Sequence, residues 1–377
     1  MPRKPLPRPP LHRWSSLTRR RFLQRSAAVA AGVSMANCRQ NLTGPGVNPG
    51  GGDANTLHIY TWANYVDDRL TDAFTERTGI RVVVDIFDSN EIMLTKMQAG
   101  GGAAYSILYP SDYVVSEMVD AGLLAALDPS LLVGMGNLKA QWQNPAYDPG
   151  NAHSVPFNWG TTGLLYNRDV TPGRPEDWSF LWDNKDALSR RITLIDDMRE
   201  TLGATLKALG YSYNATDPAQ IEAAYAKLSE LQPHIAAFKT TGFEGEILAG
   251  DLSISMAYSS DAIALTLEDD RLDYVIPVSG TSLWTDTLAI PATAPNLDAA
   301  YQWINFVLEP AVAQAAVERL FFATTNQAAF DLLPEAIRTN THLYPPESVL
   351  AKSEGIQSID TASNDLFGRF WTEITSA

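Results

Sequence analysis

The chain has 377 residues, of which 45% are hydrophobic, with nine Trp and fourteen Tyr. This size and composition are typical of a globular protein of about two domains and exclude a disordered chain. Nine of the 28 Lys and Arg residues and no acid lie in residues 1–40, which leaves 19 basic and 43 acidic residues, a formal charge of −24, on the remainder. Such a body repels nucleic acids and anionic membranes and attracts cations, although acidity also serves solubility.

The basic N-terminus predicts an export signal. Arg19 and Arg20, followed by Phe22 and Leu23, resemble the twin-arginine motif, and the small apolar residues 27–36 are too few to span a bilayer but suit the apolar core of a signal. We therefore expect a twin-arginine-type signal peptide in residues 1–37, export by the twin-arginine machinery, and a mature protein outside the cytoplasm, in the periplasm. Nothing downstream is long and apolar enough to anchor the chain.

The single cysteine, Cys38, follows this apolar run. It cannot form an intramolecular disulfide, and it stands where bacterial lipoproteins carry their lipidated residue, although Asn37 replaces the usual small residue. Two interpretations stay open: a lipid anchor on Cys38, or a free thiol without a role. Residues 38–55, rich in Gly, Pro and Asn, predict a flexible tether after either one.

Strand and helix patterns alternate through the first part of the body, which is typical of a parallel α/β sheet. We expect strands in residues 57–61, in residues 80–87, as a buried strand, and in residues 105–113, with a loop at the carboxyl end of the last. We expect helices in residues 67–79, 90–102 and 114–124. A crossing rich in Pro, Gly and Asn, residues 144–160, precedes a second set. It comprises strands in residues 161–167, 190–196, 271–277 and 283–291, a strand running into a loop in residues 252–262, and helices in residues 197–210, 218–233, 297–308 and 310–320.

Aromatic or hydroxyl side chains stand near carboxylates where several of these strands end. In open parallel sheets ligands bind outside the carboxyl ends of the strands. In "LWTDTLAIP" a strand would place Trp284 and Asp286 on one face. An ammonium group favours a carboxylate together with an aromatic face, so we predict a site for an organic cation; the alternative is a tryptophan at the core edge beside a solvated acid. The candidates are Trp62 and Tyr65, Ser111 and Tyr113, Asp197 and Glu200, Tyr258 and Asp261, and Trp284 and Asp286.

Six blocks occur in the order found in one known family: "LHIYTWANYV", "FTERTGIRVVVDIFDSNE", "YPSDY", "DDMRETLGATLKALGYS", "DPAQIEAAYAKL" and "LWTDTLAIPATAPN". From about Leu57 to the end, the chain resembles the periplasmic spermidine/putrescine-binding proteins of ABC transporters. The resemblance implies a two-lobed α/β periplasmic binding protein of type II, which closes about a hinge on a ligand in the cleft between its lobes. It places lobe 1 in residues 56–161 and 287–350 and lobe 2 in residues 162–286 and 351–377.

The resemblance also implies roles for the candidate residues. In this family aromatic rings hold the polymethylene chain and carboxylates hold the ammonium ends, without a cofactor or metal. Asp197 and Glu200 match an acidic pair that binds one amine, and Asp286 matches the deep carboxylate. The remaining implied ligand-binding residues are Trp62, Tyr65, Ser111, Tyr113, Tyr258, Asp261, Trp284 and, by a looser match near the C-terminus, Gln357. The implied partners are a polyamine and ABC transporter permease subunits, with the binding protein a monomer.

Some positions depart from the family pattern or allow another interpretation. Tyr258 stands where many members have tryptophan, and Asp261 resembles the putrescine-preferring branch, so the sequence leaves the choice between putrescine and spermidine open. Acids at the start of the 197–210 helix also suit helix capping, and we expect Asp196 to cap while Asp197 faces the cleft. Arg199 is the nearest candidate for pairing with Glu200, or with the acidic end of a different ligand.

Other functions remain as alternatives. The same fold would accept an amino acid or 4-aminobutyrate if an arginine lay in the cleft. A ligand-sensing role without transport is a further alternative. Paired carboxylates also occur in glycoside hydrolases, but the five histidines are scattered and no metal, nucleophile-elbow or phosphate-loop motif is present, so we expect no enzyme activity. A metal-binding lobe protein would require converging Tyr, His or Cys ligands.

Overall fold

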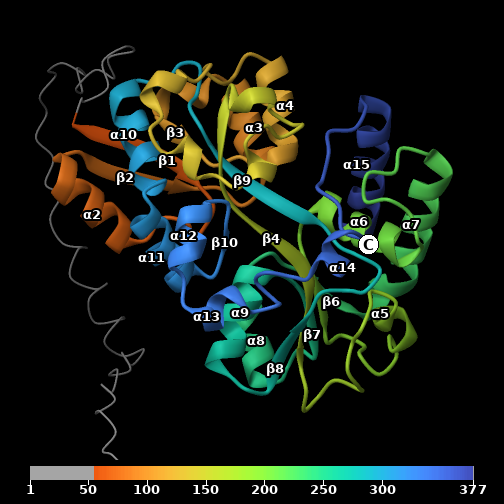
Figure 1. Ribbon diagram of the computed structural model, residues 1–377. Coiled ribbons are helices and arrows are strands. Elements are labelled where there is room, and N and C mark those ends of the chain that lie inside the picture. The colour runs from red at the N-terminus through yellow and green to blue at the C-terminus, as the bar shows by residue number, and fades with distance from the viewer. Residues whose placement is uncertain (1–54, 377) are drawn as a thin grey trace, which may run out of the picture. The chain divides into compact units, whose positions relative to one another are not determined.

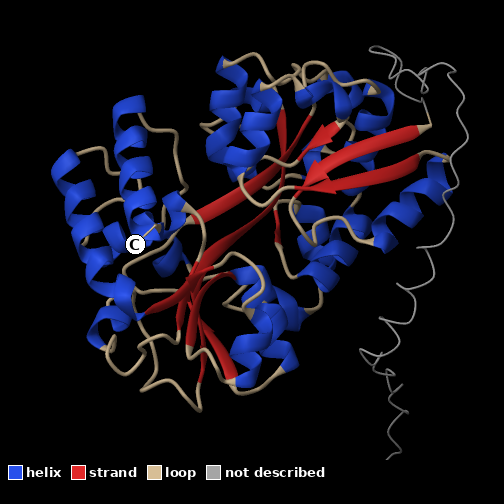
Figure 2. Cartoon of the chain, turned by 180° about the vertical axis from the view of Figure 1, so that it is seen from behind, coloured by secondary structure: helices blue, strands red, loops and turns tan. Residues whose placement is uncertain are grey.

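A computed structural model describes residues 55–376 of the chain. The predicted signal peptide, Cys38 and residues 38–54 of the predicted tether lie outside the described residues. The described part is α/β, with helices packed around one mixed sheet, two of whose strands run from one lobe into the other (Figures 1 and 2).

The first lobe begins with the predicted alternation of strands and helices. Strands β2 and β3 both pair parallel with β1. Helix α2 ends at Gly79, which adopts a left-handed conformation (φ 74°) that favours glycine, as the sequence predicted. The elements are β1 (Thr56–Thr61), α2 (Asp68–Thr78), β2 (Arg81–Ile86), α3 (Asn90–Gln98), β3 (Ile107–Leu108) and α4 (Asp112–Asp120).

The expectation that residues 80–87 form a buried strand is wrong in one respect. The strand is present as β2, but it is the first strand in the sheet order, so only β1 lies beside it among residues 55–376. Its side chains are half-buried or exposed, and Ile86 is 57% exposed. A run of β-branched residues predicts a strand, whereas burial depends on which elements cover it.

Two antiparallel strands connect the lobes. β4 (Ser154–Asn167) and β9 (Leu283–Ala289) pair with each other, and every residue of β4 is buried. β9 continues to β3 of the first lobe and β4 to β7 of the second, in the order β2-β1-β3-β9-β4-β7-β5-β6. β4 starts at Ser154, inside the segment expected to be an irregular crossing, because a register shift between Pro156 and Asn158 accommodates the proline.

The second lobe contains the remaining strands of the main order. Its central strands β5 and β7 are parallel, and β8 pairs antiparallel with β4. The sequence analysis assigned no element to the residues of β6, and it expected a strand running into a loop where α9 begins. The elements are α5 (Phe180–Asp183), β5 (Ile192–Leu194), α6 (Met198–Ala208), α7 (Pro218–Leu231), β6 (Ile235–Phe238), α8 (Glu244–Ala249), β7 (Ile254–Tyr258), α9 (Ser259–Glu268) and β8 (Leu272–Val275).

The chain then returns through β9 to the first lobe and ends on the second. Trp303 of α10 packs in one core with Leu57 of β1, whereas Phe367 and Phe370 of α15 pack in another with Leu202 of α6. The exact lobe boundaries in the sequence stay a prediction. The closing elements are α10 (Leu297–Val307), α11 (Pro310–Leu320), β10 (Ala323–Thr324), α12 (Gln327–Leu332), α13 (Glu335–Arg338), α14 (Glu347–Leu350) and α15 (Thr361–Thr375).

Candidate ligand-binding site

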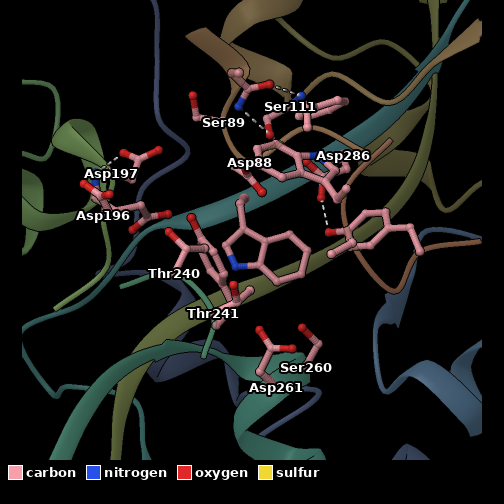
Figure 3. Close-up of a pocket in the computed structure, with 18 of the residues that line it drawn as sticks. Asp88, Ser89, Ser111, Asp196, Asp197, Thr240, Thr241, Ser260, Asp261 and Asp286 are labelled. Atoms are coloured by element: carbon pink, nitrogen blue, oxygen red, sulfur yellow. Dashed lines mark hydrogen bonds between the residues drawn. The ribbon is translucent and has the colours of Figure 1, made fainter. Parts of the chain in front are cut away.

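A cavity of about 1000 Å³ is lined by residues of both lobes. Figure 3 shows Asp286 beside Ser111, with Asp196 and Asp197 on the opposite side and Asp261 on a third. Ten of the eleven predicted ligand-binding residues line this cavity, namely Trp62, Tyr65, Ser111, Tyr113, Asp197, Glu200, Tyr258, Asp261, Trp284 and Asp286.

Gln357 is the exception. It does not line the cavity, and its side chain is exposed. Its main chain makes hydrogen bonds instead. The carbonyl accepts one from Arg199 at 3.0 Å, and the backbone N donates one to Asn214 Oδ1 at 2.8 Å. We therefore leave Gln357 out of the candidate site.

Four helices begin at the cavity, and each carries an acid in its first turn. Glu91, Asp112, Glu200 and Asp261 occupy these places on α3, α4, α6 and α9. The fold causes this, because a strand that ends at the cleft leads directly into the N-terminus of the next helix. The partial positive charge of a helix N-terminus stabilises a carboxylate there, so the same geometry concentrates acids around one cavity.

Asp286 is held on both of its carboxylate oxygens. It is 3% exposed, Ser111 Oγ donates to Oδ1 at 2.6 Å, and the Tyr65 hydroxyl donates to Oδ2. Burial raises the pKa of Asp286 to about 6, while the Ser111 and Tyr65 hydroxyls oppose this rise by favouring the charged form. The result is a deep carboxylate in a fixed orientation.

A buried asparagine extends this network to the rim. The side-chain N of Asn90, a residue 2% exposed, donates to Ser111 Oγ and to the Tyr113 hydroxyl, each at 3.0 Å, and its Oδ1 accepts from the Ser111 backbone N at 3.2 Å. Tyr113 in turn donates to Glu91 Oε1 at 3.3 Å. Side chains at the N-termini of α3 and α4 thus form a continuous hydrogen-bond network from Asp286 to Glu91.

The wall of the second lobe presents Glu200 and Asp197. The Ser282 hydroxyl approaches both carboxylate oxygens of Glu200, at 2.7 and 2.9 Å. Burial, followed by the charge of Asp197, raises the pKa of Glu200 to about 8. Burial, followed by the charge of Glu91, raises the pKa of Asp197 to about 7.

The expected division between Asp196 and Asp197 is wrong. Asp197 is the N-cap of α6, with Oδ1 accepting from the Glu200 backbone N at 2.9 Å, whereas Asp196 is exposed. Both residues still line the cavity. Asp197 caps because it has extended backbone angles directly before the first helical residue, which sequence alone does not fix.

Two further acidic residues of the cavity lining, Asp112 and Asp261, also have raised pKa values. Burial raises the pKa of Asp112 well above its usual range, with Asp286 adding to the effect, and burial raises the pKa of Asp261 to about 7, with Glu244 adding to it. In both cases desolvation disfavours the charged form of the carboxyl. A cation bound beside it would stabilise that form and lower the pKa again.

Aromatic rings complete the lining. Trp284 lies over Gly160 of β4, its cross-strand neighbour, and a Cβ at Gly160 would come within 2.2 Å of the indole. Tyr258 meets Trp284 edge-on with ring centroids 5.8 Å apart, and Trp62 meets Phe87 in the same way at 4.5 Å. Any side chain at residue 160 would therefore displace the indole from this place.

The charges that line the cavity are strongly unequal. Eight carboxylates line it, from Asp88, Glu91, Asp112, Asp196, Asp197, Glu200, Asp261 and Asp286, against two cations, Lys239 and Arg319. Lys239 pairs with Glu246 at 2.8 Å and Arg319 with Asp67 at 2.7 Å. Arg199 does not line the cavity, and its guanidinium donates to Gln357 O and Asn214 Oδ1.

Sequence reasoning missed several lining residues. Asp88, Asn90 and Glu91 follow β2, and the same signal that indicated the other sites, an acid at a helix start after a strand, would have found Glu91. Phe321 and Phe322 follow α11, and Trp371 comes from the C-terminal helix. No local pattern indicates these three, because only the packing of distant elements brings them to the cavity.

Comparison with known proteins identifies the family. Residues 69–345 match the model of the bacterial extracellular solute-binding proteins. The chain belongs to this family. It is 34% identical over 354 residues to the spermidine/putrescine-binding periplasmic protein of Salmonella typhimurium, covering 94% of this chain and 96% of that protein. It is also 30% identical over 342 residues to the putrescine-binding periplasmic protein of Escherichia coli K12, covering 86% and 92% of the two chains.

A solved structure agrees with this assignment. The spermidine/putrescine ABC transporter substrate-binding protein of Streptococcus pneumoniae is 36% identical to this solute-binding protein, with a TM-score of 0.74, covering 85% of this chain and 99% of that one. The predicted two-lobed periplasmic binding protein fold is thereby confirmed. Within residues 55–376, no helix combines the length and the apolar character needed to cross a lipid bilayer.

Proposed function

We propose that this protein captures a polyamine, putrescine or spermidine, outside the cytoplasm and delivers it to the permease subunits of an ABC transporter. The observation that carries the proposal is the lining of the cavity: eight carboxylates with aromatic rings between them, and two cations that are each already ion-paired. The similarity to relatives named as spermidine- and putrescine-binding proteins supports the same ligand class.

The chemistry of the cavity matches a polyamine in both of its parts. A polyamine consists of ammonium groups separated by apolar methylene segments, so it needs carboxylates at intervals and apolar surface between them. Asp286 and Glu200 provide carboxylates on opposite walls, and Trp62, Tyr258 and Trp284 provide ring faces. Each charge-assisted hydrogen bond in such a site contributes about 1.5–3 kcal/mol net.

A ligand with an acidic end fits this cavity less well. Amino acids and 4-aminobutyrate carry a carboxylate, which needs an available guanidinium or ammonium group beside it. Arg199, the candidate that the sequence suggested, is buried against Gln357 and Asn214 outside the cavity. Lys239 and Arg319 would each have to leave an existing ion pair.

The proposal describes binding without catalysis. No His or Cys side chain is among the described residues that line the cavity, and the family consists of solute-binding proteins. Incubation with spermidine followed by mass spectrometry should recover the ligand unchanged, and any stoichiometric product would contradict this part of the proposal.

We also propose that the twin-arginine machinery exports the protein and that a lipid on Cys38 anchors it to the membrane. The support is the sequence of the N-terminus alone: the Arg19 and Arg20 pair, the short apolar run and the cysteine that follows it. Mass spectrometry of protein extracted from membranes should find diacylglycerol on Cys38, and a free thiol at that position would remove the anchor from the proposal.

The decisive experiment is a calorimetric titration of the ligand-stripped chain from residue 41 onward in one buffer. Putrescine, spermidine, spermine, 4-aminobutyrate and glutamate are compared. We expect tight binding of at least one polyamine and weak binding of both acids, and the order among polyamines ranks the two branches by chain length. Binding of an acid and of no polyamine would overturn the proposed ligand while leaving the family assignment intact.

A further inference from the structure

The N-terminus of α3 places a carboxylate at the rim of the cavity. Ser89 caps this helix by accepting from the Ile92 backbone N at 3.2 Å, which fixes where the helix starts. The next residue, Asn90, is buried, and Glu91 is exposed and lines the cavity. Glu91 lies outside the core, and within the described residues no ion pair occupies its carboxylate.

Glu91 is nevertheless connected to the deep end of the site. The Tyr113 hydroxyl donates to Glu91 Oε1 at 3.3 Å and accepts from Asn90 at 3.0 Å, and Asn90 also donates to Ser111, whose hydroxyl donates to Asp286. Every link of this chain comes from the first lobe or from the crossing strand β9. The rim carboxylate is thus oriented by the same buried network that orients the deep one.

Asp197 faces Glu91 from the second lobe. It is the N-cap of α6, so two carboxylates at helix N-termini, one from each lobe, line the same cavity. The charge of Glu91 raises the pKa of Asp197, which supports their proximity. Two neighbouring carboxylates each raise the pKa of the other. A cation between them attracts both and stabilises both charged forms.

We propose that Glu91 is a ligand-binding residue that holds, together with Asp197, one ammonium group of the ligand across the cleft, so that the ligand itself joins the two lobes. This inference rests on the proposed polyamine ligand. It assigns the first lobe a carboxylate at the rim, in addition to the deep Asp286. The carboxylates of the ligand-free protein repel each other across the cleft, and a bound ammonium group converts this repulsion into attraction that favours closure.

A double-mutant cycle tests the inference by calorimetry with spermidine. The variants are Glu91→Gln, Asp197→Asn and the double substitution, and Asn keeps the capping function at residue 197. The matched control is Glu117→Gln, which removes the same charge from an exposed position of α4 away from the cavity. Each single cleft variant should lose about 5- to 30-fold in affinity, the double variant less than the product of the two losses, and the control less than about twofold.

Closure provides the second readout. The radius of gyration of the wild type, from small-angle scattering, should fall when spermidine is added, and Glu91→Gln saturated with spermidine should show a smaller fall. If the wild type binds spermidine and Glu91→Gln behaves like Glu117→Gln in affinity and closure, or if the two losses multiply, the inference is overturned and the proposed function stands. If the wild type binds no polyamine, both are overturned.

Discussion

The deep carboxylate Asp286 and the second-lobe carboxylate Glu200 are both buried, but the protein stabilises their charges to different extents. Asp286 accepts hydroxyl hydrogen bonds on both oxygens, from Ser111 and Tyr65, and its pKa is about 6. Glu200 also has hydroxyl groups beside it, from Ser282 and Thr162, but burial and the negative charge of Asp197 outweigh them, and its pKa is about 8.

This difference shows that burial raises the pKa of both carboxyls and that hydroxyl hydrogen bonds oppose the rise to different extents. At neutral pH the ligand-free protein holds Asp286 mostly charged and Glu200 mostly protonated. Asp286 is therefore ready to receive an ammonium group, whereas Glu200 must first lose a proton. A cationic ligand provides the missing stabilisation on the Glu200 side, so binding should be coupled to proton release.

The largest expected effect is that of Asp286→Asn. Because a fixed and already charged partner of the ammonium group is lost, polyamine affinity should fall by about 10- to 100-fold, corresponding to about 1.5–3 kcal/mol. Calorimetry at pH 7.5 measures this, with Asp120→Asn on the exposed face of α4 as the control for charge alone. An unchanged dissociation constant for Asp286→Asn would show that the deep carboxylate does not contact the ligand.

Glu200→Gln should have a smaller effect at neutral pH that grows with pH. At pH 6.5 the wild-type carboxyl already carries a proton in the ligand-free state, so the substitution should cost only about threefold, rising toward tenfold or more at pH 8.5. Titrations at pH 6.5, 7.5 and 8.5 test this. Equal losses at all three values would contradict the raised pKa of Glu200.

Ser111→Ala should make Asp286 behave more like Glu200. Loss of the hydroxyl donor raises the pKa of Asp286 further, so affinity should fall by about three- to tenfold near pH 6.5 and by less at pH 8.5, where the carboxyl ionises anyway. Ser106→Ala is the matched control, because Ser106 is also buried in the first lobe and its hydroxyl has no hydrogen-bond partner among the described residues. The idea fails if both variants bind alike.

The smallest expected effect is on the stability of the ligand-free protein. The pKa values of Asp197, Asp261 and Glu200 are raised to about 7, 7 and 8, whereas unfolded Asp and Glu titrate near 4. Between pH 6.5 and 8.5 the folded protein therefore binds more protons than the unfolded chain, so stability falls as pH rises. The Tm should drop by a few degrees across this window.

Saturating spermidine provides the comparison for this pH effect. The bound cation favours the charged carboxylates, so the pH dependence of Tm should become flatter with ligand than without it. Surface carboxylates such as Asp269, with a pKa of about 2, are ionised throughout this range and do not contribute. A ligand-free Tm that stays constant or rises between pH 6.5 and 8.5 would contradict the raised values.

The sequence alone determined much of the fold and most of the candidate site. Three predicted features depend only on residues close in the sequence, and the structure has all of them. They are the periodicity of strands and helices, the end of α2 at Gly79, and the alternation that places Trp284 and Asp286 on one face of β9. The ten cavity-lining candidates could be predicted from the sequence because they follow the end of a strand or lie on a strand close to its end. The topology of the sheet brings these strand ends together.

Only the tertiary structure decided burial, capping and long-range contacts. β2 lies at an edge although most of its residues are apolar, Asp197 and not Asp196 caps α6, and Gln357 supplies only its main chain to Arg199. Phe322 reaches Tyr65 from 257 residues away, with ring centroids 4.4 Å apart. Local patterns fix what a segment can form, whereas these outcomes depend on which distant elements pack against it, and that is settled only when the whole chain folds.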